Sequence, residues 1–391
     1  MKRTVEIAGA GIAGLTAGLA FAQKGWRVRV HERRDALRGV GRGVHLWHSG
    51  LRVLDALGVL GPAIAGAVGT TRQERRNYDG TTFSSSSLGQ DFPLHLLLRE
   101  CLLATLSGAL IETGGEVVFS SRAVAAHPDG WLYFADGSSR RADLVVGADG
   151  VNSTIRDSLG LLRWRHPVNQ FGYRTVVPRE PDEHERETGC THVEFWNGSR
   201  RLLYMPSTAD LAYVQLTSLA GDSAANTVPI NQDFWRSLFP DQASIIDRIP
   251  TDGSGEWFEI VRLDQWSSGH AAVIGDAATA QPPFLGHGAG CSLMSAFALA
   301  RAVDDADDVI QGLADWEMNE RPFTEWLQWV AYWYGQLAFL APRVRSAVLK
   351  AIDTSEWAKR RILLAATRRD VTAMRFSPPS VPSPIICPLI H

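Results

Sequence analysis

The first 32 residues limit the fold most strongly, because they indicate one strand–helix–strand unit that ends in an acidic residue. The stretch TVEIAGAGIAGLTAGLAFAQKGWRVRVHE predicts a strand over residues 4–8, a helix over about 12–24 and a second strand over 27–31. Two strands joined through a helix normally lie parallel in one sheet. We therefore expect an α/β protein with a parallel sheet formed by its N-terminal part.

Three glycines, Gly9, Gly11 and Gly14, form a GxGxxG pattern between that strand and helix. In such a turn the first glycine allows a tight bend, the second lets the backbone approach a pyrophosphate, and the third lets the helix pack on the strand. The N–H groups at the helix start then face phosphate oxygens. Glu32 ends the second strand, where its carboxylate suits ribose hydroxyls. Together these features predict a dinucleotide site.

A second buried strand ends in a carboxylate within ADLVVGADGVNSTIRDSLG, residues 142–160. The strand is expected to end at Asp149, and Ser153 to cap a following helix that contains Arg156. An ordinary strand–helix turn would also contain Asp-Gly. This stretch therefore indicates a ligand site only when it is taken together with the N-terminal GxGxxG unit and the glycine-rich stretch at residues 275–292.

The third carboxylate is Asp276, in GDAATAQPPFLGHGAGCS, residues 275–292. A glycine-rich helix entry offers N–H donors and leaves room for a flat ligand. A metal or catalytic site on Asp276 and His287 is the competing interpretation. No ligand-spaced histidine or cysteine accompanies His287, so we expect no metal.

Composition excludes several other classes of protein. The chain has 391 residues, 45% of them hydrophobic, and a net charge of -3, so it offers no basic field for nucleic acid. Its four cysteines are far apart, which argues against disulfides or zinc and fits the cytoplasm. No apolar run is long enough to predict a membrane span, and the N-terminal apolar stretch belongs to the strand–helix–strand unit rather than to a secretory signal.

The order GxGxxG, GADG with a downstream arginine, and GDAA followed by PPxxGxG resembles the signature of class A FAD-dependent aromatic monooxygenases, the p-hydroxybenzoate hydroxylase-like group, over roughly residues 1–310. The stretches LWHSGLRVLDALG, RRLLYMP and QPPFLGHGAGCSLMSAFAL are most similar to a pyridine-ring-cleaving branch of that group. The resemblance implies a Rossmann-like FAD domain, NADH or NADPH as co-substrate, and O2.

The resemblance also assigns FAD contacts. By match, Asp276 binds the ribityl and pyrophosphate region, Arg99 reaches the phosphate and ribose side, and the backbone at Val124 meets the adenine. Arg42 stands where the group commonly has alanine, in a glycine loop beside the flavin. The expected cofactor-binding residues are Gly9, Gly11, Ala13, Gly14, Glu32, Arg33, Arg42, Arg99, Val124, Asp149, Asp276, Pro283, Gly286, Gly288 and Ala289.

Fewer residues point to the substrate. Arg201 and Tyr213, and less closely Arg174, match positions that face the substrate in the ring-cleaving branch, whereas His45 and Gln73 stand where tyrosines are expected. An inward arginine suits a carboxylate or phenolate; ion pairing on the sheet surface and, for Tyr213, core packing are the alternatives. His45 is expected to help move a substrate proton. The expected catalytic residues are His45, Arg201, Tyr213 and Pro283, and the expected substrate-binding residues are Arg174, Arg201, Tyr213 and Gln73.

The chain is expected to divide into three parts. The first is a discontinuous FAD domain at 1–70, 96–165 and 263–310, and the second is an antiparallel β-sheet substrate domain at 71–95 and 166–262. The third part, 311–391, contains C-terminal helices to about residue 370, followed by a Pro/Ser-rich tail.

The resemblance implies insertion of oxygen from O2 into an electron-rich aromatic or N-heteroaromatic ring through a flavin C(4a)-hydroperoxide. Ring opening, plain hydroxylation and epoxidation stay open. A flavin-dependent halogenase is disfavoured because the WxWxIP motif is absent. The sequence does not distinguish the monooxygenase from a flavoprotein reductase or dehydrogenase, or from a non-catalytic flavin-binding module.

Overall fold

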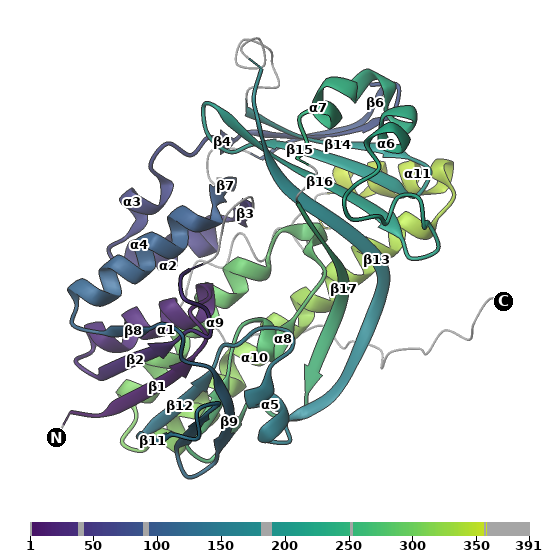
Figure 1. Ribbon diagram of the computed structural model, residues 1–391. Coiled ribbons are helices and arrows are strands. Elements are labelled where there is room, and N and C mark those ends of the chain that lie inside the picture. Colours follow the sequence, from purple (N-terminus) through teal and green to yellow (C-terminus); the bar gives the residue numbers. More distant parts are fainter. Residues whose placement is uncertain are drawn as a thin grey trace.

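The computed structural model describes residues 2–37, 43–88, 94–180, 190–250, 253–355 and 357. Two large sheets dominate the molecule, a six-stranded sheet near the N-terminus and a seven-stranded sheet at the opposite end (Figure 1). The long helix α10 (Val309–Gln336) runs from one sheet to the other, and its Gly335 carbonyl accepts a hydrogen bond from Gln170 of the second sheet. Together they frame the cavities of the candidate site.

The six-stranded sheet is the parallel sheet predicted from the N-terminal sequence. Its elements β1 (Thr4–Ala8), α1 (Ile12–Gln23) and β2 (Arg27–His31) confirm the predicted unit almost residue for residue. The strand order is β18–β19–β12–β1–β2–β8, and only β18 is antiparallel to its neighbour. The other strands are β8 (Glu116–Val118), β12 (Leu144–Gly147), β18 (Ser267–Ser268) and β19 (Ala271–Val273).

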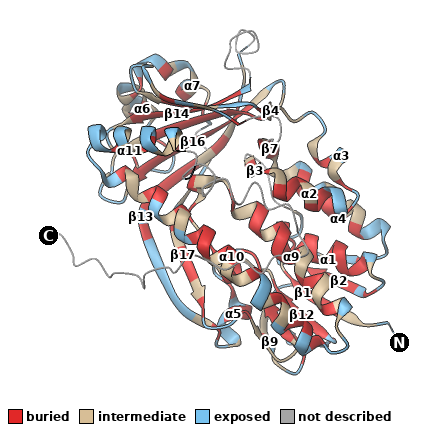
Figure 2. Cartoon of the chain, turned by 180° about the vertical axis from the view of Figure 1, so that it is seen from behind, coloured by how far each residue is buried: buried red, intermediate tan, exposed pale blue. Residues whose placement is uncertain are grey.

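Helix α1 is buried along almost its whole length (Figure 2). It lies against the sheet and also packs on two longer helices, so nearly every side of it meets protein. This explains why its sequence is apolar and small all round rather than amphipathic. The two helices are α4 (Arg99–Glu112) and α9 (Gly288–Asp305).

The seven-stranded sheet contains the tryptophan-rich alternating stretches that predicted antiparallel strands. One pair differs: β14 runs parallel to β5. Parallel neighbours need a long crossover connection, and here the chain passes through much of the six-stranded unit between the two strands. In order across the sheet, the strands are β17 (Ser254–Leu263), β13 (Leu162–Pro178), β16 (Leu211–Leu219), β15 (Arg200–Pro206), β14 (Thr191–Asn197), β5 (Arg72–Asn77) and β6 (Thr82–Ser87). These segments support the expected domain division, which stays a prediction.

The two faces of this sheet differ in chemistry. Because side chains alternate along a strand, β14 directs Val193 to one face and its neighbours His192 and Glu194 to the other. The apolar face packs around Trp235 of a short helix and forms a core of its own. The polar face is turned toward the segment that contains Pro283. The helices that cover the apolar face are α6 (Gln232–Leu238) and α7 (Ala243–Asp247).

Smaller elements complete the fold. A three-stranded sheet contains β3 (Gly43–Leu46), β7 (Leu94–Leu98) and β4 (Gly69–Thr70), and another contains β11 (Ser139–Arg141), β10 (Trp131–Phe134) and β9 (Ala123–His127). The remaining helices are α2 (His48–Ala56), α3 (Leu60–Ile64), α5 (Thr154–Ser158), α8 (Asp276–Thr279), α11 (Pro342–Thr354) and the 3-10 turns Pro240–Gln242, η4 (Pro283–Leu285) and Leu337–Phe339. None of the described helices is both long and apolar enough to cross a membrane.

The C-terminal part is helical, as expected, through the end of α11. The predicted continuation to about residue 370 and the Pro/Ser-rich tail lie outside the described residues.

Candidate active site

The glycine turn after β1 is built by close backbone packing. Gly9 has φ +103°, and a Cβ there would lie 2.4 Å from the Ala148 carbonyl oxygen. A Cβ on Gly14 would lie 2.0 Å from the Gly9 carbonyl oxygen. A Cβ on Gly11 would meet nothing within 4 Å. Gly9 and Gly14 are therefore needed for the fold of the turn, whereas Gly11 borders open space.

Two helices begin at this open space without a side-chain cap. The N-cap residues are Gly11 for α1 and His287 for α9, and neither first turn contains an acidic residue. The residues that follow His287, Gly288 and Ala289, line the same cavity as Gly11. Uncapped N–H groups and the positive ends of two helix dipoles therefore converge on one cavity, which suits an anionic ligand.

Glu32 supports the glycine turn from the end of β2. One oxygen of its carboxylate accepts a hydrogen bond from the Ala10 N–H at 3.2 Å, and the other accepts one from the Arg34 N–H at 3.0 Å. Glu32 and Arg33 both line a cavity beside this turn. The geometry leaves carboxylate lone pairs for a ribose while the same group stabilises the loop.

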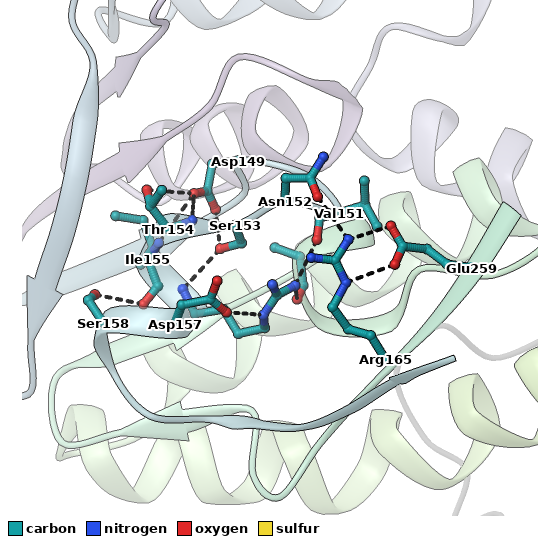
Figure 3. A network of polar contacts seen from close by, with 12 residues as sticks. Asp149, Val151, Asn152, Ser153, Thr154, Ile155, Asp157, Ser158, Arg165 and Glu259 are labelled. Carbon is teal, nitrogen blue, oxygen red and sulfur yellow. Dashed lines mark hydrogen bonds and ion pairs between the residues drawn. The ribbon is translucent and has the colours of Figure 1, made fainter. Parts of the chain in front are cut away.

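Asp149 acts as a helix cap (Figure 3). Its carboxylate accepts hydrogen bonds from the Ser153 hydroxyl at 2.5 Å and from the Thr154 N–H at 2.8 Å. The Ser153 hydroxyl in turn accepts from the Arg156 N–H at 2.9 Å, which confirms the predicted cap. Asp149 also lines the cavity beside the glycine turn, but its carboxylate is largely used by the cap, so its expected FAD contact stays a prediction.

Arg156 joins two of the sequence motifs. It is fully buried, and its Nη1 donates to the Val151 carbonyl at 2.9 Å and to the Ala277 carbonyl at 3.2 Å. Its Nε donates to Asp157 at 2.8 Å. The loop after β12 and helix α8, which follows β19, are therefore held together by one guanidinium.

A second arginine connects the long strands to the same region (Figure 3). Arg165 on β13 donates to Glu259 on β17 and to Asn152 of the loop after β12, at 2.8 Å in each case. Glu259 also lines the cavity that Gly11, Gly288 and Ala289 border. The seven-stranded sheet is thus tied directly to the loop that Arg156 organises.

Three neighbouring cavities lead from the glycine turn to the seven-stranded sheet. The loop cavity lies beside the glycine turn, the middle cavity beside α9, and the inner cavity under the polar face of the seven-stranded sheet. Gly11 and Arg99 border both the loop and the middle cavities. The middle and inner cavities share four lining residues, namely His45, Gln215, Pro283 and Gly286.

Most expected FAD residues line the first two cavities. In the loop cavity these are Gly9, Gly11, Glu32, Arg33, Arg99 and Asp149, and in the middle cavity Gly11, Ala13, Arg99, Asp276, Pro283, Gly286, Gly288 and Ala289. Gly14 packs inside the turn, and Val124 is on β9 next to Ala123, which lines the loop cavity. Arg42 lies outside the described residues.

Asp276 projects into the middle cavity from the start of α8. The Asp276 side chain is accessible from the open cavity, and desolvation by the surrounding protein raises the pKa of its carboxyl, while Arg99 and then Arg174 oppose that rise. A group with hydroxyls, such as a ribityl chain, would find an acceptor here.

His45 lies at the junction of the middle and inner cavities. Its ring is edge-on to Tyr213, with centroids 5.5 Å apart, and 6.0 Å from the ring of His192. Burial, followed by His192 and Arg174, lowers the pKa of His45 to about 3. The imidazole is therefore neutral near pH 7 and a weak base, and its expected role in moving a substrate proton stays a prediction.

Of the other expected substrate residues, Gln73 lines the inner cavity and Tyr213 and Arg174 line the middle one. The Tyr213 hydroxyl donates to Gln215 at 2.9 Å, and Arg174 pairs with Glu256. These positions are consistent with ligand contact, which stays a prediction.

Arg201 differs from its expected place. Its guanidinium is 3.7 Å from the Glu194 carboxylate and lies over the rings of Trp196 and Phe284, with the side chain 3% exposed. It lines neither the middle nor the inner cavity. A buried carboxylate thus lies beside its guanidinium, and its predicted contact with the substrate stays a prediction.

The inner cavity is also lined by residues that were not expected, among them Arg75, His192, Gln215 and Asp353. His192 is opposite Gln73 in the register of the parallel β14–β5 pair. The charged residues of the strand RQERRN, such as Arg75, were the sequence signal available for this wall of the cavity. The strand that pairs with it was not evident from the sequence.

The residues around the loop and middle cavities fit FAD. Gly11 and Gly150 border space in which a Cβ would meet nothing within 4 Å, and the donor set of two uncapped helix starts matches a pyrophosphate and a flat ring. Among the described residues, no group of three or more His, Cys, Asp or Glu side chains could hold a metal ion.

A family model described as "FAD binding domain" matches residues 2–316 of the chain. The chain belongs to the class A flavin monooxygenase family. As an FAD-dependent monooxygenase it uses bound FAD with NAD(P)H and O2, and when bound, reduced FAD supplies the activation of O2.

Similar proteins agree with this assignment. The monooxygenase is 38% identical to "Putative 2-heptyl-3-hydroxy-4(1H)-quinolone synthase" of Rhodococcus erythropolis, over 90% of this chain and 92% of that one. It is 37% identical to "2-heptyl-3-hydroxy-4(1H)-quinolone synthase" of Mycobacteroides abscessus, over 90% and 94%. The solved structure of 2-methyl-3-hydroxypyridine-5-carboxylic acid oxygenase superposes with a TM-score of 0.84 at 32% identity, covering 93% of this chain and 96% of that one.

The buried histidines of the monooxygenase predict a loss of stability in acid. The pKa of His192 is about 4, lowered from 6.5 mainly by burial, so between these values only the unfolded chain binds the proton. The free energy of unfolding is therefore unaffected by this histidine above pH 6.5. Between pH 6.5 and about 4 it falls by about 1.4 kcal/mol per pH unit for each such histidine. His192→Asn is expected to make that fall shallower, measured by urea unfolding at about pH 5 and about pH 7.5.

The matched control for His192→Asn is His127→Asn, since His127 is 54% exposed at its side chain. It should leave the pH dependence of stability unchanged. Identical slopes for the wild type and His192→Asn would contradict the lowered pKa of His192.

Proposed function

We propose that the protein hydroxylates a neutral N-heteroaromatic ring of the 4(1H)-quinolone type. The names of the two relatives with 37–38% identity describe 3-hydroxylated quinolones as their products. The same names give an alkyl chain on the ring. This proposal narrows the electron-rich aromatic substrate that the family implies.

The charge balance of the inner cavity carries the proposal. Arg75 and Asp353 are the charged side chains on its described wall, and they pair with each other at 2.7 Å. Behind the wall, Arg201 is near Glu194. Each guanidinium therefore has a carboxylate beside it, so the cavity offers no excess positive charge to an acidic ring. This disfavours the carboxylate or phenolate substrate that the sequence suggested.

The uncharged lining also suits such a ring. His45 and His192 both have lowered pKa values, so they present neutral ring nitrogens near pH 7. A neutral imidazole can donate to a carbonyl or accept from an N–H, which are the two polar groups of a 4(1H)-quinolone. The remaining wall is largely apolar and would take an alkyl chain; it includes Trp47, Leu88, Leu94, Leu203, Phe284, Leu285 and Ile352.

Ring opening is the second candidate, supported by the structural similarity to the pyridine-carboxylic acid oxygenase. That relative's name specifies an acid. The compensated arginines near the inner cavity are therefore the observation that favours hydroxylation of a neutral ring here.

The cysteines support a location in a reducing compartment such as the cytoplasm. Among the described residues, Cys101, Cys190 and Cys291 form no disulfide.

The test is NADH and NADPH oxidation by the purified flavoprotein with a 2-alkyl-4(1H)-quinolone, followed by product mass under labelled O2. We expect the quinolone to stimulate oxidation and the intact ring to gain a single labelled oxygen. An acyclic product would support ring opening instead. Stimulation by pyridine or phenol carboxylates but not by the quinolone would overturn the proposed substrate class.

A further inference from the structure

The inner cavity is closed on one side by α11, a helix outside the 2–316 region that the family model matches. Ile352 and Asp353, near its end, both line the cavity. The adjoining wall is β5, where Gln73 and Arg75 point to the same face because they are two residues apart. The lining of the inner cavity thus comes from a C-terminal helix as well as from the sheet.

Arg75 is held by a set of oxygen atoms. Its Nη1 donates to the Asp353 carboxylate at 2.7 Å and to the Ser84 hydroxyl at 3.1 Å, and its Nε donates to the Tyr334 hydroxyl at 3.1 Å. Ser84 also donates to Asp353. The side chains of Arg75 and Asp353 are only 6% and 13% exposed. The pair is therefore largely withdrawn from solvent. In this buried position its charges are only weakly screened.

We propose that Asp353 is a specificity-determining residue that cancels the charge of Arg75 and so excludes carboxylated rings from the inner cavity. The proposal rests on the proposed function. If Asp353 lost its charge, Arg75 would present an uncompensated fork of donors to the cavity, which is the arrangement that binds a carboxylate best. A more distant carboxylate, Glu194, is 4.0 Å from the Arg75 Nε and is shared with Arg201.

The experiment compares the binding of 4(1H)-quinolone and of its 2-carboxylate to the FAD-loaded protein by equilibrium dialysis. For Asp353→Asn we expect the carboxylate to gain about tenfold or more in affinity relative to the neutral ring, as for a new charge-assisted hydrogen bond. The double variant Arg75→Gln/Asp353→Asn should return the ratio to that of the wild type, because both charges are gone.

The control is Asp129→Asn, which removes an exposed carboxylate (73% exposed) in the β9–β10 turn and should leave the ratio unchanged. An unchanged ratio in folded, flavin-loaded Asp353→Asn would overturn the proposal. If Asp353→Asn fails to fold, Arg75→Gln provides the mirror test: the remaining Asp353 should favour a 2-aminomethyl ring over the neutral one, and no such preference would overturn the proposal. Failure of the wild type to bind the neutral quinolone would instead overturn the proposed function, and this inference with it.

Discussion

Replacing Gly11 with valine is expected to strip the purified protein of its flavin while leaving the chain folded. The backbone at Gly11 is extended, with φ -82° and ψ -176°, which valine adopts readily, and a Cβ there meets no protein atom within 4 Å. The added side chain would enter the space shared by the loop and middle cavities. FAD affinity should fall about 10- to 100-fold, as for overfilling a close-packed contact.

The measurement for Gly11→Val is the ratio of flavin to protein absorbance after purification, together with circular dichroism. Gly108→Ala is the matched control, because a Cβ on Gly108 also meets nothing within 4 Å but Gly108 is inside α4, away from the cavities. It should retain flavin and gain up to about 1 kcal/mol from the better helix former. Full flavin content in Gly11→Val would show that the cofactor does not approach this backbone.

Replacing Arg156 with methionine is expected to destabilise the protein by about 3 kcal/mol and to weaken FAD retention. Methionine fills much of the buried volume but donates no hydrogen bond, so the carbonyls of Val151 and Ala277 lose their shared donor. Val151 lines the middle cavity, and Ala277 directly follows Asp276, which lines it as well. Urea unfolding with and without added FAD measures the two effects.

Arg163→Met is the control for Arg156→Met. Arg163 lies 3.8 Å from Asp264, and both side chains are about two-thirds exposed (64% and 66%). Its loss should change stability by no more than about 0.5 kcal/mol. Equal effects of the two substitutions would contradict the role of Arg156 in joining the loops.

Most of the residues that the sequence assigned to FAD line the loop and middle cavities, because the patterns that pointed to them are local; their contacts with FAD stay a prediction. The sequence patterns of the glycine turn, of the end of β2 at Glu32 and of the Ser153 cap each lie within a short stretch of the chain. Their order along the chain then identified the family. Even here Asp149 was assigned to the cofactor, although much of its hydrogen-bonding capacity goes to the helix that follows.

The inner cavity was predicted poorly because its walls come from distant parts of the chain. Arg75 and Asp353 are separated by 278 residues, and His192 meets Gln73 only through the parallel β14–β5 pair. Arg201 was on the correct face of the sheet but behind Phe284. Alternation along a strand indicates which side chains share a face, yet it does not say which of them reach the cavity.

The wall shared by the middle and inner cavities has a consequence for how this enzyme diversifies. His45, Pro283 and Gly286 border both cavities, and a Cβ on Gly286 would lie 2.8 Å from the His45 Cβ. Selection for a new substrate that acted on these positions would disturb the flavin at the same time. Gln73 and Asp353 border only the inner cavity, so inherited changes in substrate range are expected to accumulate there first.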